Sequence, residues 1–552
     1  MQNKKSILKN KTFLLASQGC KIRDHYQYLD WVPIFEKMFA KLIVFSTRDN
    51  YFRYGKEKMN QLFLEVIKNE KPDFTLLSMN YDEFEPETLL QIKEISPNTK
   101  VIHFFGDDEW RFEDWSRYYV PFFDYCLVTE RDTSEYKKDK IKNVYSLLGI
   151  NPERFKPLNL EKKYDVIFAG APIADRPDYI KFLLKNNINI KVFSPGWENY
   201  PEFKEVYGGY LSHENYTKLI NQAKINLSFS KGFLPGSKKG QVKGRSFEIP
   251  ACKAFMLVED TLGLKLYLKD SRKISFKTKK ELLEKIKYFL EHDKEREKLA
   301  EHFYKQVINN YTWELQFRNF FEKISSEPKP EKKIGFINKI TQKVYYLSKD
   351  DFNLNAQELL EKLKNYNYIT FSKGKCEKSK YKDYFQIYSL KKSGKEISCC
   401  DYYVSSKRLG DYLLFQSKKA FYFLDSDKFN KFVNINQITV TKEYFIKNIH
   451  QFKKALENEA FELINKQNTI FVSIPLISLE EVNPLDYNAM KKVFQMRFRD
   501  NLFSLMYQKK ISSIPYFYNF IFTAISGKQF MLKYLFDSVF NKENLRRLIG
   551  SK

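Results

Sequence analysis

The stretch "YDVIFAGAPIADRPDYIKFLLKN" (residues 164–186) joins two kinds of sequence pattern. It begins with an apolar run typical of a buried β-strand, passes through a loop that contains prolines, and ends with apolar residues at helical spacing. A strand that is apolar along its length and is followed by a helix is typical of a parallel sheet with helices on both faces. Because this unit recurs along much of the chain, it decides the fold class, which is α/β.

The same alternation fills the first 150 residues and then restarts after a linker, "GINPERFKPLNLEKK" (residues 149–163). Strands are predicted at 12–17, 41–46, 73–79, 100–105, 124–129 and 142–148, and again at 164–170, 188–194, 224–230, 254–260 and 272–276. Helices are predicted at 28–40, 55–69, 176–186, 213–223 and 279–310. The pattern predicts two doubly wound Rossmann-like domains, at residues 1–155 and 160–325. Their ligand is expected at the carboxyl ends of the strands, in a cleft between the domains.

A second linker, "SSEPKPEKK" (residues 325–333), precedes a less regular region at residues 334–552, which we expect to be an extra basic α+β domain with a helical tail. Residues 331–552 contain 38 Lys and Arg against 22 Asp and Glu, a net charge of +16 out of +26 for the whole chain. This excess predicts either an anionic partner or simply a solvated, lysine-rich surface. The tail from Lys491 has 12 cations and 3 anions around "ISSIPYFYNFIFTAISG". It fits an interfacial helix on anionic lipid and, equally, a core helix against the third domain.

Composition and cysteines exclude several classes of protein. With 43% hydrophobic and 17% aromatic residues, the chain is globular rather than disordered. Its 6 cysteines form no C-x-x-C pair and have no histidine at metal-binding spacing, so we expect reduced thiols, no metal site and no cofactor. No stretch resembles a spanning helix of about 20 apolar residues. The predicted location is the cytoplasm. If the tail binds lipid, the protein would be peripheral at the inner face of the membrane.

Charged residues cluster in "GQVKGRSFEIPACKAFMLVED" (residues 240–260), where a glycine-containing loop should enter a short helix over residues 242–252. Backbone N–H groups at such a helix start, together with Lys243 and Arg245, can bind a diphosphate. Glu248 lies three residues after Arg245 and could accept two hydrogen bonds from the vicinal hydroxyls of a ribose. An Arg–Glu pair on an ordinary helix surface explains the same spacing.

The segment "KGRSFEIPAC" followed by "AFMLVED" resembles the signature of the CgeB-like, spore-maturation type glycosyltransferases of glycosyl transferase group 1, in the GT-B superfamily. The resemblance extends over about residues 10–325. It includes "VIHFFGDDEWRF", "LLGINPERFKP", "YDVIFAGAPIADRP" and "YTWELQFRNF", which occur in the expected order.

The resemblance implies a nucleotide-sugar donor on the second domain and an acceptor on the first. It assigns Lys243 and Arg245 to the diphosphate, Glu248 to the ribose and Arg176 to a further diphosphate contact. Catalysis in such enzymes needs no bound metal, because fixed cations stabilise the leaving nucleoside diphosphate. The chain departs from the family it resembles at two positions. Many relatives have glycine where this chain has Lys253, and retaining relatives often have a second glutamate where this chain has Gly240.

Other candidate site residues follow predicted strands. In "HFFGDDEW" (residues 103–110), Asp107 could deprotonate an acceptor hydroxyl or orient His103, which is itself a possible base. Helix capping by an aspartate beside a structural histidine explains the same residues. Ser230, at the end of a strand, is expected to contact the donor phosphate. In "SHENY", Ser212 is the expected N-cap of the helix that follows.

Together these patterns predict a metal-independent glycosyltransferase that moves a sugar from a nucleoside-diphosphate sugar to a hydroxyl on a glycan, a lipid-linked intermediate or a protein. A non-catalytic protein that binds nucleic acid or glycan on a Rossmann-like scaffold is the alternative. Nucleic acid is the less expected partner, because the cluster around Arg245 includes a carboxylate that a phosphate backbone would repel.

Overall fold

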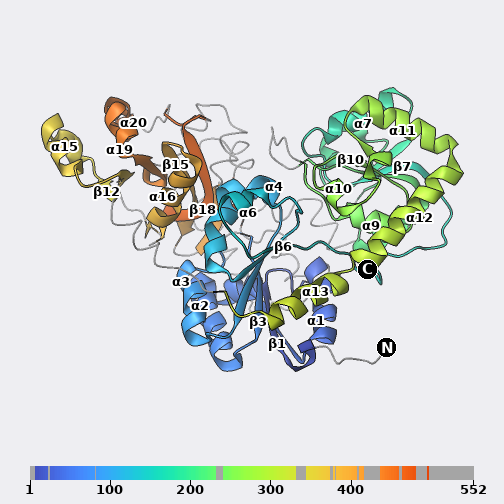
Figure 1. Ribbon diagram of the computed structural model, residues 1–552. Helices are drawn as coiled ribbons and strands as arrows, with labels where there is room; N and C mark the ends of the chain where they lie inside the picture. Colours follow the sequence, from blue (N-terminus) through green and yellow to red (C-terminus); the bar gives the residue numbers. More distant parts are fainter. Residues whose placement is uncertain are drawn as a thin grey trace.

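The computed structural model describes thirteen segments of the chain, and Figure 1 shows how their helices and strands are arranged. The described residues are 7–22, 25–80, 82–209, 211–231, 240–330, 344–372, 377–378, 381–406, 410–415, 435–458, 463–465, 467–479 and 494–496. Three sheets organise them: two parallel sheets in the first 330 residues and a mixed sheet beyond residue 343.

The first sheet has six parallel strands in the order β2-β1-β3-β4-β5-β6. The strands are β1 (Thr12–Ser17), β2 (Lys41–Ser46), β3 (Phe74–Ser78), β4 (Lys100–Phe105), β5 (Tyr125–Val128) and β6 (Val144–Ser146). Successive side chains of β1 enter opposite cores, since Phe13 and Leu15 belong to one apolar cluster while Leu14 and Ala16 belong to another. Burial on both faces explains why these strands are apolar along their whole length.

Helices cover both faces of this sheet. On one face lies α1 (Val32–Met38), which follows a π-helical turn at Gln27–Trp31. On the other face lie α2 (Thr47–Glu70) and α3 (Pro86–Ile95), whose buried residues share a core with Leu14. The α2 helix changes direction at Gly55, which has φ 79° and ψ 172°.

The second sheet has five strands in the order β11-β10-β9-β7-β8, and all neighbouring pairs are parallel. Its strands are β7 (Tyr164–Ala169), β8 (Ile190–Phe193), β9 (Ala223–Ser228), β10 (Met256–Glu259) and β11 (Ser275–Phe276). The helices around it are α7 (Arg176–Lys185), α8 (His213–Gln222), α9 (Arg245–Ala251), α11 (Lys279–Glu291) and α12 (Asp293–Asn310). Two parallel sheets with helices confirm the predicted pair of Rossmann-like domains. The single helix expected over 279–310 is two helices that meet at His292.

The last helix of the second predicted domain belongs with the first sheet. In Figure 1, α13 (Trp313–Ser326) lies beside α1 rather than with α11 and α12. Its Phe317 is 4.7 Å from Phe35, and its Phe321 is 5.1 Å from Phe13, measured between ring centroids. The chain therefore crosses back to its first domain, and aromatic packing stabilises the crossing.

The region beyond residue 343 contains a mixed sheet, as expected for an α+β domain. Its strands are β12 (Val344–Leu347), β13 (Tyr368–Phe371), β14 (Glu377–Lys378), β15 (Ile397–Ser406), β16 (Gly410–Phe415), β17 (Ile438–Thr441), β18 (Thr469–Leu479) and β19 (Phe494–Met496). The β15–β18 pair is parallel, and the β15–β16 and β15–β17 pairs are antiparallel. The predicted helical tail lies outside the described residues except for β19, which is a strand.

This third sheet is attached to the first domain through α16 (Lys382–Ser393). Phe385 on α16 lies 5.4 Å from Tyr119, between ring centroids, and Lys392 pairs with Asp139 at 3.2 Å. Ser473 on β18 donates a hydrogen bond to Asp114 at 2.8 Å. The third domain therefore supports the segment that follows β4. Among the described helices, none is both long and apolar enough to span a membrane.

Candidate donor site and the facing carboxylate

The predicted cation cluster lies at the carboxyl edge of the second sheet, where β7, β9 and β10 end. The sequence pattern predicts that Lys243 lies in the first turn of this helix. In the structure α9 begins at Arg245, so Lys243 lies in the loop before it. Pro250 is near the end of α9, as expected. The helix thus carries Arg245 and Glu248, while the preceding loop carries Lys243.

Arg176 and Arg245 come together although they lie 69 positions apart in the chain. Arg176 is the first residue of α7, and its guanidinium donates to the backbone carbonyl of Ala171 at 3.0 Å. Arg245 donates to the carbonyl of Ala169 at 2.9 Å. Both guanidiniums lie near the buried Phe168 ring, with their carbon atoms 5.6 and 5.5 Å from its centroid. The end of β7 therefore holds two cations side by side.

Each of these arginines keeps a buried Nε that makes no hydrogen bond within the described part of the chain. Arg176 is only 3% exposed. Burial, and secondarily the charge of the Arg245 guanidinium, lower the pKa of Arg176 to about 9, so Arg176 remains charged near neutral pH. Between residues that the structure describes, no ion pair of either arginine with a carboxylate is found within 4.0 Å. Two adjacent guanidiniums, one buried and one partly buried, form a cationic site that suits an anionic ligand.

Gly170 makes room for these side chains. A Cβ atom at this position would lie 2.7 Å from the Phe168 ring and 3.0 Å from a guanidinium nitrogen of Arg245. The carbonyl of Gly170 also accepts a hydrogen bond of 2.7 Å from the indole of Trp197. Any larger residue here would force the Phe168 ring to shift and would crowd Arg245.

Glu248 is held in place by Tyr216 of α8, whose hydroxyl donates to Oε2 of the carboxylate at 3.1 Å. Burial raises the pKa of Glu248, whereas Arg245, Arg154 and the Tyr216 hydrogen bond oppose the rise. Ser212 caps α8 by accepting from the N–H of Asn215, which confirms the predicted N-cap. The carboxylate is therefore partly buried, one helical turn from Arg245.

A buried ion pair lies next to Glu248 and was not predicted from the sequence. Arg154 donates two hydrogen bonds to Asp30, at 2.8 and 2.6 Å, and Asp30 is 2% exposed. Asp30 lies in the π-helical turn of the first domain and Arg154 lies in the first linker, so the pair fixes the linker to the first domain. "LLGINPERFKP" contains Arg154, but nothing in the sequence pattern names its partner.

Ser230 lies two residues beyond the end of β9 and is hydrogen-bonded to a carboxylate. Both its N–H and its hydroxyl donate to Glu259, at 2.9 and 3.0 Å. Lys231 pairs with Glu259 at 3.0 Å and with Asp175 at 2.5 Å. In this arrangement Ser230 orders the edge of the sheet beside Arg176, and its contact with donor phosphate stays a prediction.

Lys243 points toward the first domain. Its ammonium donates to Oε1 of Gln241 at 2.5 Å and lies 3.8 Å from Oδ1 of Asp107. Gln241 in turn donates to Thr129 at 3.2 Å, and the N–H of Val242 donates to Glu130 at 3.0 Å. The loop before α9 therefore forms a bridge between the domains, and it brings two predicted site residues together.

Asp107 follows β4 and has a left-handed backbone conformation, with φ 59° and ψ 30°. Its side chain is 55% exposed and makes no capping hydrogen bond to the short helix α4 (Asp108–Arg111) that follows it. Left-handed backbone is uncommon for a residue other than glycine and is concentrated at functional sites. Asp107 therefore does not cap the helix that follows it, which was the alternative explanation for this residue.

Asp108 and His103 are both enclosed in the first domain. Asp108 accepts hydrogen bonds from Ser116 and Tyr136, and burial raises its pKa to about 6. His103 is 0% exposed, its Nε2 accepts from the N–H of Met79 at 3.1 Å, and burial lowers its pKa well below the usual value. The environment of His103 is that of a neutral core histidine, and it does not favour the predicted role as a base.

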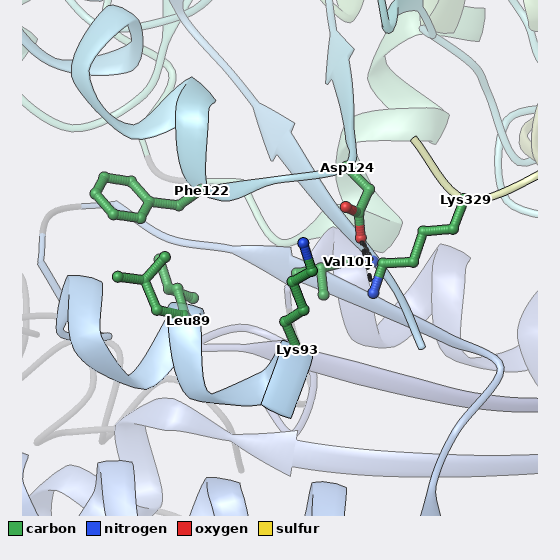
Figure 2. Close-up of a pocket in the computed structure, with 7 residues that line it drawn as sticks. Leu89, Lys93, Val101, Phe122, Asp124 and Lys329 are labelled. Carbon is green, nitrogen blue, oxygen red and sulfur yellow. Dashed lines mark hydrogen bonds and ion pairs between the residues drawn. The ribbon is translucent and has the colours of Figure 1, made fainter. Parts of the chain in front are cut away.

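A pocket lies near the start of β4 (Figure 2). It is lined by Leu89, Leu90, Lys93, Val101, Phe122, Asp124 and Lys329. Lys329 pairs with Asp124 at 3.6 Å. Val101 is near the start of β4 and Asp107 follows its end, so this pocket is separate from the donor site. Within the described residues, no group of three His, Cys, Asp or Glu side chains is placed to hold a metal ion.

Comparisons with known proteins bear on this site directly, because a family model described as "Glycosyl transferase-like" matches residues 176–322, from Arg176 into α13. The chain is a glycosyltransferase. It is 23% identical over 295 residues to the spore protein CgeB of Bacillus subtilis strain 168, a match that covers 48% of this chain and 91% of CgeB. The predicted resemblance to CgeB-like enzymes is confirmed.

Solved structures similar to this glycosyltransferase are also glycosyltransferases. One from Rickettsia africae has a TM-score of 0.43 at 13% identity, and Anabaena HepE in complex with UDP and glucose has 0.44 at 10% identity. Each of these two alignments covers 58% of this chain and 100% of the solved chain. A DNA-modifying β-glucosyltransferase has a TM-score of 0.38 at 14% identity and covers 56% of this chain and 98% of its own.

Proposed function

We propose that this glycosyltransferase takes a sugar from a nucleoside-diphosphate sugar bound at Arg176, Arg245 and Glu248, and transfers it to a hydroxyl acceptor beside Asp107. One observation carries the proposal: the buried Arg176 and the partly buried Arg245 lie side by side, and each has a buried Nε that makes no hydrogen bond among the described residues. The diphosphate of the donor carries the negative charges and acceptor oxygens that such a pair can bind.

The arginine pair also suits the chemistry of the leaving group. When the bond between the anomeric carbon and the phosphate oxygen breaks, the departing diphosphate keeps the electron pair and gains negative charge. Arg176 and Arg245 are already fixed to the carbonyls of Ala171 and Ala169, so they need no reorganisation to stabilise this charge. We therefore propose a reaction that does not depend on a metal ion.

Glu248 is the proposed ribose contact. It lies one helical turn beyond Arg245, and Tyr216 fixes one of its oxygens. A carboxylate whose orientation is fixed can accept hydrogen bonds from two vicinal hydroxyls. The same side chain would be repelled by a phosphate backbone, which speaks against nucleic acid as the ligand of this site.

Asp107 is the proposed catalytic base. Its exposed carboxylate would remove the proton from the acceptor hydroxyl while the acceptor oxygen forms its bond to the anomeric carbon. The acceptor belongs to the broad class of hydroxyl-bearing glycans, lipid-linked intermediates and proteins. A cytoplasmic location and contact of the basic tail with an anionic membrane surface stay predictions, since the tail is outside the described residues apart from β19.

The binding of nucleotides tests the donor site. Calorimetric titration in buffer with EDTA is expected to show saturable binding of either UDP or GDP to the full chain, with Glu248→Ala weakening the binding about 10-fold or more, as expected when a charge-assisted hydrogen bond is lost. UDP-glucose, which HepE and a T4 phage glucosyltransferase hold in solved structures, is the first sugar donor to test. The absence of binding to either nucleotide, or binding that Glu248→Ala leaves unchanged, would contradict the proposal.

The pH dependence of that binding provides a signature of Glu248. Because burial raises its pKa, the carboxylate takes up a proton at a higher pH than an exposed glutamate does. Nucleotide affinity is therefore expected to be greatest above this raised pKa and to fall as the pH drops through it. The Glu248→Gln variant lacks this carboxylate. Its nucleotide affinity should fall only where the phosphate itself takes up a proton, with a pKa of about 6. Identical pH profiles for the two proteins would exclude this role.

A further inference from the structure

The ion pair between Lys243 and Asp107 joins the proposed donor site to the proposed base. The ammonium is 3.8 Å from the carboxylate oxygen and 2.5 Å from Oε1 of Gln241, on the side of the loop that faces the first domain. Lys243 is nevertheless only two residues from Arg245, with Gly244 between them. Its flexible stem can therefore direct the ammonium toward either Asp107 or a ligand of Arg245.

We propose that Lys243 couples donor binding to release of the base. In the free enzyme the ammonium holds Asp107, and a bound diphosphate draws the ammonium away, which leaves Asp107 able to accept the proton of the acceptor. This inference rests on the proposed function, because it requires a diphosphate at Arg176 and Arg245. It predicts that the donor must bind before Asp107 can act.

Charge and geometry both favour this exchange. The Asp107 carboxylate that pairs with Lys243 is 55% exposed and 3.8 Å away, so this ion pair is weak. A diphosphate presents more negative charge and several acceptor oxygens, and the guanidiniums of Arg176 and Arg245 would hold it in place. Asp107 has the shorter side chain, whereas the lysine has a flexible four-carbon stem, so the lysine is the group that moves between the two partners.

A double-mutant cycle on nucleotide affinity tests the exchange without measuring catalysis. The full-length wild type, Asp107→Asn, Lys243→Ala and the double variant are titrated with UDP or GDP, whichever the wild type binds. Asp107→Asn is expected to bind the nucleotide about two- to five-fold more tightly than the wild type, because Lys243 no longer has to leave a carboxylate. In the Lys243→Ala background the same substitution is expected to have no effect.

Two controls separate this coupling from general electrostatics. Asp270→Asn removes a carboxylate from another exposed pair, with Lys273 at 4.0 Å, and should leave nucleotide affinity unchanged. The corresponding nucleoside, which has no diphosphate, should show no difference between wild type and Asp107→Asn. Thermal unfolding shows whether each variant is folded.

Two results would overturn the inference. One is unchanged or weaker nucleotide binding by folded Asp107→Asn, and the other is equal tightening in the wild-type and Lys243→Ala backgrounds, which would show that the lysine takes no part. No nucleotide binding by the wild type would instead overturn the proposed function, and this inference with it.

Discussion

Replacing Arg245 by alanine is expected to lower turnover of the nucleotide sugar by about 10²–10³-fold, the loss typical of removing one preorganised group that stabilises developing charge. Arg245 donates to the carbonyl of Ala169 and lies beside Phe168, so its charge is fixed before the donor arrives. Nucleotide affinity should fall as well, because the guanidinium would contact the diphosphate in both the ground state and the transition state. Release of nucleoside diphosphate in the presence of EDTA measures the turnover.

Two further variants keep this result interpretable. Arg245→Lys retains the charge but loses the planar fork, and should recover only part of the activity. Arg318→Ala removes a partly exposed arginine on α13, which pairs with Glu314 at 2.6 Å, and should leave turnover unchanged. Full activity of folded Arg245→Ala would exclude Arg245 from the donor site.

Asp107→Asn is expected to reduce turnover by about 10²–10⁴-fold, the usual contribution of a general base, while nucleotide binding is retained. An amide has nearly the same shape as the carboxylate, but it does not accept a proton at neutral pH. Because the side chain is 55% exposed and caps no helix, the substitution should not affect folding. Parallel measurements of turnover and of nucleotide affinity separate the chemical step from binding.

The matched control for this variant is Asp178→Asn, an exposed aspartate near the start of α7 that lies 4.0 Å from Lys279. Its turnover should equal that of the wild type. If Asp107→Asn kept wild-type turnover, the base would have to be another residue. His103 would not become the stronger candidate, because it is fully buried.

Sequence patterns located the two parallel sheets closely, and the physical reason is burial. Strands such as β1 and β4 are covered on both faces, so their apolar runs begin and end with the strand itself. The helical spacing of α7 and α8 was equally clear, and the serine cap of α8 was correct. Local pattern is informative wherever burial and periodicity coincide.

Contacts between distant segments could not be predicted in this way. The approach of Arg176 to Arg245, the Asp30–Arg154 pair and the Lys243–Asp107 pair depend on how strand ends and domains meet. The return of α13 to the first domain depends on Phe317 and Phe321, whose spacing fits any amphipathic helix. The position of Lys243 before the helix follows from where α9 starts, and helix boundaries are the least certain part of a sequence-based prediction.

The central claim is that the donor binds where β7 and α9 present Arg176, Arg245 and Glu248. Amide hydrogen exchange of the full chain, measured with and without a saturating nucleotide sugar, tests it most directly because it needs no substitution. We predict slower exchange in peptides that cover residues 169–176 and 244–252. Donor-dependent protection confined to the third domain, or to the first domain alone, would contradict the account.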